Sequence, residues 1–235
     1  MRIIGHLKGL LGDAILPPRE SPSHPSLQFG ARVPPESPAR PEDRRMGATV
    51  TEAEISQEIA LLSARLHAPD YTPPTPPMLV DVDGGTAVWR VTTKMSGEVF
   101  MSAMDFSFNA SMFIVHCDAD RLLLAWLRSG NYAIPRQAMP MDYKYESACA
   151  GFARGRTNPV PVANATAHDI LGTEKIGFNN GITRTYWLLS NEAPSLPVRV
   201  CGTDSAALLH RLAGIGNGPV SFSGLFAAQD CAMRP

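Results

Sequence analysis

The chain has 235 residues, a formal net charge of −1 and a hydrophobic share of 44%. A net charge this close to zero argues against a strongly basic protein that binds nucleic acid indiscriminately, because such binding depends on many Lys and Arg contacts to phosphates. It does not exclude a local basic site, and the apolar share is enough for one domain with a core plus extra segments.

The cysteines and the apolar runs indicate the compartment. Cys117, Cys149, Cys201 and Cys231 form no pair with zinc-ligand spacing, which favours idle thiols in a reducing compartment. No apolar run reaches the roughly 18 residues that a membrane helix needs. We therefore expect a cytoplasmic protein without membrane insertion.

Residues 1–45 are predicted to be a disordered, proline-rich leader. Prolines with Ser, Glu and Arg between them leave too little apolar surface to offset the entropy of ordering. Two alternatives stay open for this region. Residues 3–16 could form a short amphipathic docking peptide, and translation could start at Met46.

Residues 46–77 are predicted to contain an amphipathic helix and a proline-rich linker. Between Thr51 and Leu66, apolar residues recur on one helical face, and Thr51 with Glu54 has capping-box spacing. Five prolines between Pro69 and Pro77 indicate a stiff, extended connector.

Residues 78–215 are predicted to form an α/β domain, followed by an uninformative tail at 216–235. Residues 78–82 and 86–93 predict a hairpin around a glycine turn, and 112–117 predict a strand before a helix at 119–128 that Asp118 caps. His116, Asp118 and Asp120 could also suggest a metal site, although capping and solvation explain the carboxylates more simply. The remaining predicted helices are 142–153, 182–191 and 203–213, and the remaining predicted strands are 161–164, 175–178 and 197–201.

The most informative segment runs from Lys175 to Leu189. A strand enters Asn179–Asn180–Gly181, whose residues tolerate a positive φ, and leads directly into a helix. The first turn of a helix has unpaired N–H groups that favour phosphate or carboxylate. Thr183 and Thr185 can add hydroxyl donors, and Arg184 can add a guanidinium. On spacing alone, the segment is better explained by Asn180 or Thr183 simply capping the helix, with Arg184 on a solvated face.

This segment resembles the signature of the ParB/sulfiredoxin superfamily, in which a Gly-x-His-Arg turn opens a helix that is followed by a Pro-Val-x-Val strand. The matching residues are Phe178, Gly181, Arg184, Thr185, Leu188–Leu189 and Leu196-Pro197-Val198-Arg199-Val200. The resemblance implies an α/β fold with a small mixed sheet and flanking helices. In that fold, Asn158-Pro159-Val160-Pro161-Val162-Ala163 would form the first strand, beside the signature turn.

One branch is most similar, the plasmid fertility-inhibition proteins, which block conjugative transfer of other plasmids. The similarity rests on Lys144–Tyr145, Phe152, Asn158-Pro159-Val160-Pro161 and Gly181-Ile182-Thr183-Arg184-Thr185, within a match from Phe113 to Gly214. It implies a protein that obstructs a type IV secretion machine and whose partner is the coupling ATPase or another secretion component, with DNA as a further candidate.

The resemblance also implies a nucleotide or phosphate site, with ATP or another nucleoside triphosphate as the candidate ligand and no metal. The candidate binding residues are Asn179, Asn180, Gly181, Thr183, Arg184, Thr185 and Lys144, and the candidate catalytic residues are Arg184 and Glu146. Solvated surface charge is the competing interpretation for Glu146 and Lys144. His168 and Asp169 are expected in the loop between the two signature strands, within reach of a ligand or on the surface.

One departure from the motif bears on catalysis. Thr183 stands where the superfamily has its histidine, so a possible acid/base group is lost and hydrolysis is in more doubt than binding. No cysteine lies in the turn, which argues against sulfiredoxin chemistry. A nucleotide-dependent nuclease or phosphohydrolase is the alternative function, and a plain α/β binding module is a third.

Overall fold

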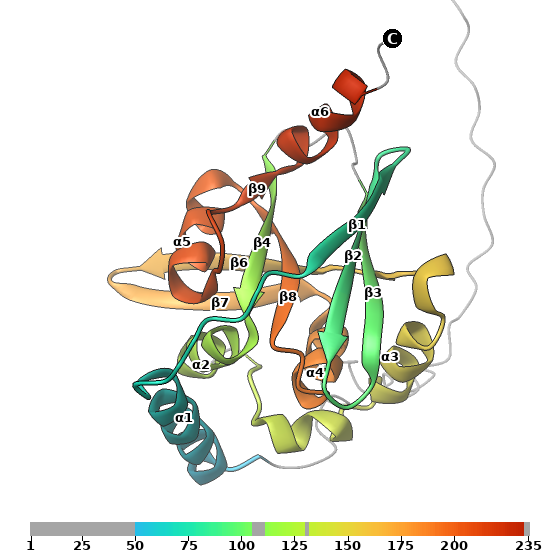
Figure 1. Cartoon of the computed structure of the whole chain (residues 1–235). Helices are drawn as coiled ribbons and strands as arrows, with labels where there is room; N and C mark the ends of the chain where they lie inside the picture. The colour runs from blue at the N-terminus through green and yellow to red at the C-terminus, as the bar shows by residue number, and fades with distance from the viewer. Residues whose placement is uncertain (1–49, 105–110, 130–131, 233–235) are drawn as a thin grey trace, which may run out of the picture. The chain divides into compact units, whose positions relative to one another are not determined.

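The structure is a computed structural model that describes residues 50–104, 111–129 and 132–232 (Figure 1). Strands and helices alternate along most of this part of the chain. The strands are β1 Met78–Asp83, β2 Thr86–Thr93, β3 Gly97–Met104, β4 Met112–Asp118, β5 Val160–Pro161, β6 Ala163–Ile170, β7 Thr173–Asn180, β8 Ser195–Cys201 and β9 Val220–Ser221. The α-helices are α1 Glu52–Leu66, α2 Ala119–Ser129, α3 Tyr145–Phe152, α4 Ile182–Ser190, α5 Thr203–Ala213 and α6 Phe222–Ala232, and two 3₁₀ helices are η2 Arg136–Met141 and η3 Gly155–Thr157.

The described strands form two mixed sheets. One has the order β1-β2-β3-β5, and the other has the order β7-β6-β8-β4-β9. Most neighbours are antiparallel, but β3 pairs with β5 and β6 pairs with β8 in parallel. The α/β class with small mixed sheets and flanking helices is therefore confirmed, while membership of the ParB/sulfiredoxin superfamily stays a prediction.

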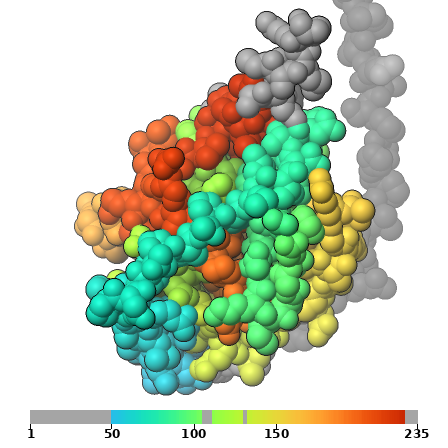
Figure 2. Space-filling view, in the orientation of Figure 1, coloured from blue at the N-terminus to red at the C-terminus, as the bar shows by residue number. Residues whose placement is uncertain are grey.

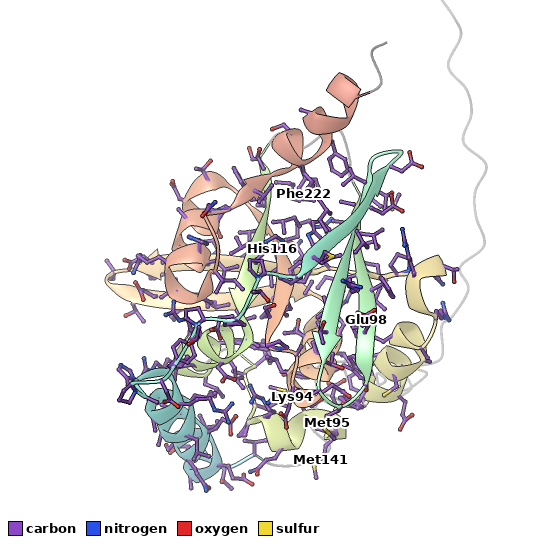
Figure 3. All side chains as sticks on the ribbon, in the orientation of Figure 1. Lys94, Met95, Glu98, His116, Met141 and Phe222 are labelled. Carbon is purple, nitrogen blue, oxygen red and sulfur yellow. The ribbon has the colours of Figure 1, made fainter. Side chains whose placement is uncertain are left out.

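The two faces of the five-stranded sheet are covered differently. On one face, Trp89 of β2 lies edge-on against His116 of β4, with 6.3 Å between ring centroids, so the four-stranded sheet packs there. Figure 3 shows His116 close to the crossing of β4 and β1. On the other face, α5 contacts β4 and β6, α2 contacts β7, and the two helices contact each other. Trp126 of α2 and Trp187 of α4 are both buried in the core.

Helix α1 and the linker agree with the sequence prediction in detail. The Thr51 hydroxyl accepts a hydrogen bond from the Glu54 amide at 3.2 Å, and the Glu54 carboxylate accepts one from the Thr51 amide at 2.8 Å. Figure 2 shows the segment after α1 running over the surface to β1. It is held there by the Ser195 hydroxyl, which donates to the Thr75 carbonyl at 2.7 Å, and by Pro77, which is buried.

Several boundaries predicted from the sequence are wrong. The predicted strand at 161–164 is divided, because Val160–Pro161 joins β3 in one sheet and the chain then enters β6 in the other. The predicted helix at 142–153 begins only at Tyr145. Strand β3 and helix α6 were not predicted: β3 lies in a segment that gave no clear signal, and α6 lies in the tail judged uninformative.

The predictions for residues 1–45 lie outside the described residues, as does the question of a start at Met46. The domain limits at 46–77, 78–215 and 216–235 stay predictions. Among the described residues, no helix combines the length and apolar character needed to cross a membrane.

Candidate phosphate site

The site is built around the corner between β7 and α4. Gly181 has a φ of +88° there, which favours glycine over every residue with a side chain. A Cβ atom at this position would lie 2.8 Å from the Ala163 Cα and 2.8 Å from the Arg184 Nε, closer than real Cβ contacts. No side-chain oxygen caps the helix that follows. The corner therefore requires glycine, and it leaves the positive end of the helix dipole without a side-chain acceptor.

A cavity of about 560 Å³ opens at this corner. Its polar wall includes Asn179, Asn180, Gly181, Thr183, Arg184, Lys144 and Arg154. Its apolar and aromatic wall includes Tyr132, Ile134, Ala138, Met141, Tyr143 and Tyr186. In Figure 3, Met141 lies at the end of η2. The volume falls within the range of small-molecule sites, which are mostly apolar with a few convergent polar groups.

Arg184 crosses from α4 to the neighbouring strands. Its Nη2 donates to the Asn180 Oδ1 at 3.1 Å, and its Nη1 donates to the carbonyl oxygen of Pro161. Both acceptors are neutral, so the charge of the guanidinium is not compensated by either. Burial, and secondly the positive charge of Arg199, lower the pKa of Arg184 below its ordinary value.

The cavity wall also carries a carboxylate. Asp142, which follows η2, accepts a hydrogen bond from the Thr183 hydroxyl at 3.0 Å and another from the Lys144 amide at 2.9 Å. Lys144 itself is exposed, and its Nζ lies 5.2 Å from the centre of the Tyr143 ring. Thr183 is thus held in place by Asp142.

Comparison with known proteins gives three findings. A family model described as plasmid fertility inhibition factor matches residues 114–214, which include the Gly181 corner. Protein osa of Shigella flexneri is 34% identical over 172 residues, which cover 72% of this chain and 89% of that protein. The chain belongs to the plasmid fertility inhibition factor family.

The third comparison is with a solved structure. The crystal structure of oncogenic suppression activity protein, described as a plasmid fertility inhibition factor and solved as a gold(I) cyanide derivative, is 32% identical to this chain. The match has a TM-score of 0.68 and covers 77% of this chain and 97% of the other. The two fertility inhibition factors therefore share a fold over nearly all of the solved relative.

Six of the predicted binding residues lie together on the cavity wall of this fertility inhibition factor. They are Asn179, Asn180, Gly181, Thr183, Arg184 and Lys144. Thr185 is not among the lining residues, because its side chain is fully buried and its hydroxyl donates to the Gly181 carbonyl at 3.0 Å. Its position indicates that it stabilises the corner from within.

Two other predictions are not supported by position. Glu146 is exposed in the first turn of α3 and does not line the cavity. His168 and Asp169 do not lie in a loop: both belong to β6, where they pair with Lys175 and Glu174 near the hairpin turn, at the opposite end of β7 from the cavity. The hairpin is longer than predicted because the strand continues beyond its apolar part.

The alternative metal site at His116, Asp118 and Asp120 is also not formed. The Asp118 carboxylate accepts hydrogen bonds from the Asp120 amide at 2.9 Å and from the Arg121 amide at 3.1 Å, so it caps α2. Asp120 binds Arg65 and Arg136. Within the described part of the chain, no three metal-ligating side chains come together.

Sequence reasoning did not find Asp142, Tyr143 or Arg154 as wall residues. They are brought to the corner by η2, α3 and the segment after α3, which pack against α4 through Phe152 and Trp187, with 4.2 Å between ring centroids. The available signal was the run of polar and aromatic residues Asp142–Tyr143–Lys144 just before α3. The sequence prediction included these residues in the helix itself.

Proposed function

We propose that this fertility inhibition factor obstructs conjugative DNA transfer through a type IV secretion machine, and that the cavity at Gly181 binds the phosphates of a nucleotide or of DNA for this purpose. The observation that carries the proposal is the meeting of an uncapped helix start, Arg184 and Lys144 on one wall of a cavity large enough for a nucleotide. These groups favour negative charge through hydrogen bonds and through the helix dipole.

Two further lining residues suit a ligand with more than a phosphate. Tyr143 and Met141 line the cavity, and the two residues are 48% and 60% exposed. Both are large and apolar, so they can pack against the ring of a bound base. Exposed aromatic side chains beside cationic groups are typical of sites that bind bases together with phosphates. A nucleotide therefore suits both walls of the cavity.

The proposed partner is the coupling ATPase of the secretion machine, or another component of that machine. The support is membership of the plasmid fertility inhibition factor family, together with the resemblance of the sequence to the ParB/sulfiredoxin superfamily. In this proposal the bound nucleotide or DNA phosphate holds the factor in the form that engages its partner.

The test combines binding with transfer. Titration calorimetry of the full chain with ATP should detect binding in the wild type and a loss of about tenfold or more in Arg184→Ala, because one charge-assisted contact is removed. Expressed in donor cells, the wild type should reduce transfer of a second conjugative plasmid, and Arg184→Ala should restore it. Arg211→Ala, which alters an arginine paired with Glu174, is the matched control and should behave like the wild type.

Two results would contradict the proposal. If the well-folded wild type bound neither ATP nor DNA, the proposed ligand of the cavity would be wrong. Full inhibition of transfer by Arg184→Ala, at equal expression, would show that inhibition does not use this cavity.

A phosphohydrolase or nuclease is the second candidate, and one contact favours it. The Thr183 hydroxyl donates to the Asp142 carboxylate at 3.0 Å on the cavity wall, so a proton acceptor lies beside a hydroxyl at the proposed phosphate position. Arg184 would stabilise the charge that develops on the phosphate. If this is right, purified wild type turns over ATP or CTP faster than Arg184→Ala, whereas equal background rates would leave binding as the only function.

A further inference from the structure

The sheet beside the cavity places three polar side chains in a row. Asn164 of β6 pairs with Asn180 of β7 on one side and with Arg199 of β8 on the other. Residues that pair across neighbouring strands have side chains on the same face of a sheet. Since Asn180 also accepts the hydrogen bond from Arg184, this row connects Arg184 at the cavity to Arg199 behind it.

Two atoms of this row have no protein partner among the described residues. They are the Nε of Arg199 and the Oδ1 of Asn164, and both are buried. A buried donor or acceptor without a partner costs free energy, so groups of this kind in a native protein call for an explanation. The row thus holds two of the five unpartnered buried side-chain atoms among the described residues.

Arg184 and Arg199 differ in their counter-charges from five other arginines, while Arg121, Arg128 and Arg154 resemble them. Arg90, Arg156 and Arg211 each form a salt bridge to a carboxylate, and Arg65 and Arg136 share one. For Arg184 and Arg199, the described structure contains no such bridge. Two guanidiniums near each other without a carboxylate repel one another, and the lowered pKa of Arg184 reflects this repulsion in addition to burial.

We propose that Arg199 is a specificity-determining residue of the phosphate site, which together with Arg184 makes the site prefer a multiply charged phosphate group over a singly charged phosphodiester. The inference rests on the proposed function and narrows its ligand to the terminal phosphates of a nucleotide, as opposed to the backbone of DNA. Coulomb energy scales with the product of the charges. Arg199 therefore adds to the positive charge of Arg184, Lys144 and Arg154, and it strengthens the binding of a multiply charged group more than that of a phosphodiester.

The test uses two small probes on the full chain, inorganic pyrophosphate and diethyl phosphate, with affinity measured by calorimetry. The wild type should bind pyrophosphate at least tenfold more tightly than diethyl phosphate. Arg199→Gln should reduce this ratio to about threefold or less, while Arg199→Lys, which keeps the charge, should retain most of it. Arg211→Gln removes the same charge far from the cavity and should leave the ratio unchanged.

A thermal melt without ligand separates this role from a structural one. Removing Arg199 relieves repulsion on Arg184, so the midpoint of Arg199→Gln should stay equal to or rise above that of the wild type. A lower midpoint with parallel losses for both probes would show a structural role and overturn the inference. If Arg199→Gln does not fold, Arg199→Met keeps the aliphatic stem and serves in its place.

The two proposals fail in different ways. If the wild type binds neither probe, the phosphate site itself is wrong. If Arg184→Ala loses pyrophosphate while Arg199→Gln keeps the full ratio between the probes, the phosphate site stands and only the role of Arg199 is overturned.

Discussion

The starts of α2 and α4 differ in which groups accept hydrogen bonds from the first-turn amides and from the nearby arginines. At α2, the Asp118 carboxylate accepts hydrogen bonds from two first-turn amides, and the next carboxylate, Asp120, binds Arg136 at 2.7 Å and Arg65 at 2.9 Å. At α4, Gly181 provides no oxygen, and Arg184 donates only to neutral acceptors. One helix start pairs its arginines with its own anions, whereas at the other the Asp142 carboxylate accepts from the Thr183 hydroxyl and Arg184 donates to neutral acceptors.

The difference shows where a ligand is expected. A cluster that is satisfied by its own carboxylates contributes to stability and has little to gain from an external anion. A cluster with positive charge and a cavity in front of it gains from an anion supplied by a ligand. Asp118 and Asp120 stand within the chain segment that starts α2, whereas the carboxylate near the start of α4, Asp142, comes from a distant segment and binds Thr183 and not Arg184, and this contrast can be tested.

The largest expected effect comes from Gly181→Ala. The substituted residue must adopt a positive φ, and its Cβ meets the backbone of Ala163. We expect a loss of about 3 kcal/mol in the free energy of unfolding, measured by denaturant titration, together with loss of ATP binding. Gly172→Ala is the control: its φ is +80° but no atom lies within 4 Å, so about 1 kcal/mol is expected. Equal losses in both variants would disprove close packing at the corner.

Asp120→Asn should have the next largest effect. Burial acts to raise the pKa of Asp120, but the hydrogen bonds and charges of Arg136 and Arg65 outweigh it and lower the pKa. Because the folded pKa lies below the unfolded value, the stabilisation is present above about pH 4 and is lost as the pH falls further.

We therefore expect Asp120→Asn to lose about 2 kcal/mol at pH 7, and to lose less stability than the wild type on acidification from pH 5 to pH 3. Chemical denaturation at a series of pH values measures both. ATP affinity at pH 7 should not change, since this cluster lies outside the cavity. Reduced ATP affinity without loss of stability would reverse the comparison between the two helix starts.

Arg184→Ala should affect ligand binding without affecting the fold. Its two acceptors are neutral and its charge is repelled by Arg199, so the free energy of unfolding should change by less than about 0.5 kcal/mol. The melting midpoint of the wild type should rise with added pyrophosphate, and that of the variant should not. A large loss of stability in the unliganded variant would show that Arg184 stabilises the fold instead of serving the ligand.

The smallest effect is expected for Thr183→Val. The change keeps the side-chain shape and removes the hydroxyl that donates to Asp142. A loss of about 0.5–1 kcal/mol in stability is expected, with a change of about threefold or less in ATP affinity. Calorimetry and denaturation on the same preparation measure both quantities. A loss of affinity as large as that of Arg184→Ala would mean that the hydroxyl contacts the ligand directly.

The part of the fold that could be predicted from the sequence is the part with strong local signals. The capping box at Thr51, the helix at 203–213 and the strand after Gly181's helix are all present, because caps, apolar periodicity and runs of β-branched residues act over a few neighbours. Strand β3 was missed because its segment has no clear local signal, although it pairs with the neighbouring strand β2, and helix α6 was missed because it lies in a Gly- and Ser-rich tail.

The candidate site shows the same division. The corner Asn179–Asn180–Gly181 and Arg184 were identified from a turn signal and from a resemblance. Asp142 and Tyr143 were not, because both reach the site only when α3 and η2 pack against α4. Glu146 has the charge expected of a site residue, but the phase of its helix directs it away from the cavity wall.

By itself, the sequence determined the α/β class, the glycine corner and the arginine that follows it, since each depends on backbone conformations and propensities within a short segment. Only the tertiary structure decided that the corner faces a cavity, that Asp118 and Asp120 are already occupied as cap and ion-pair partner, and that Arg199 lies behind Arg184. Those outcomes depend on which distant strands pair and which charges then meet, and electrostatic energies follow distance in space, not separation in sequence.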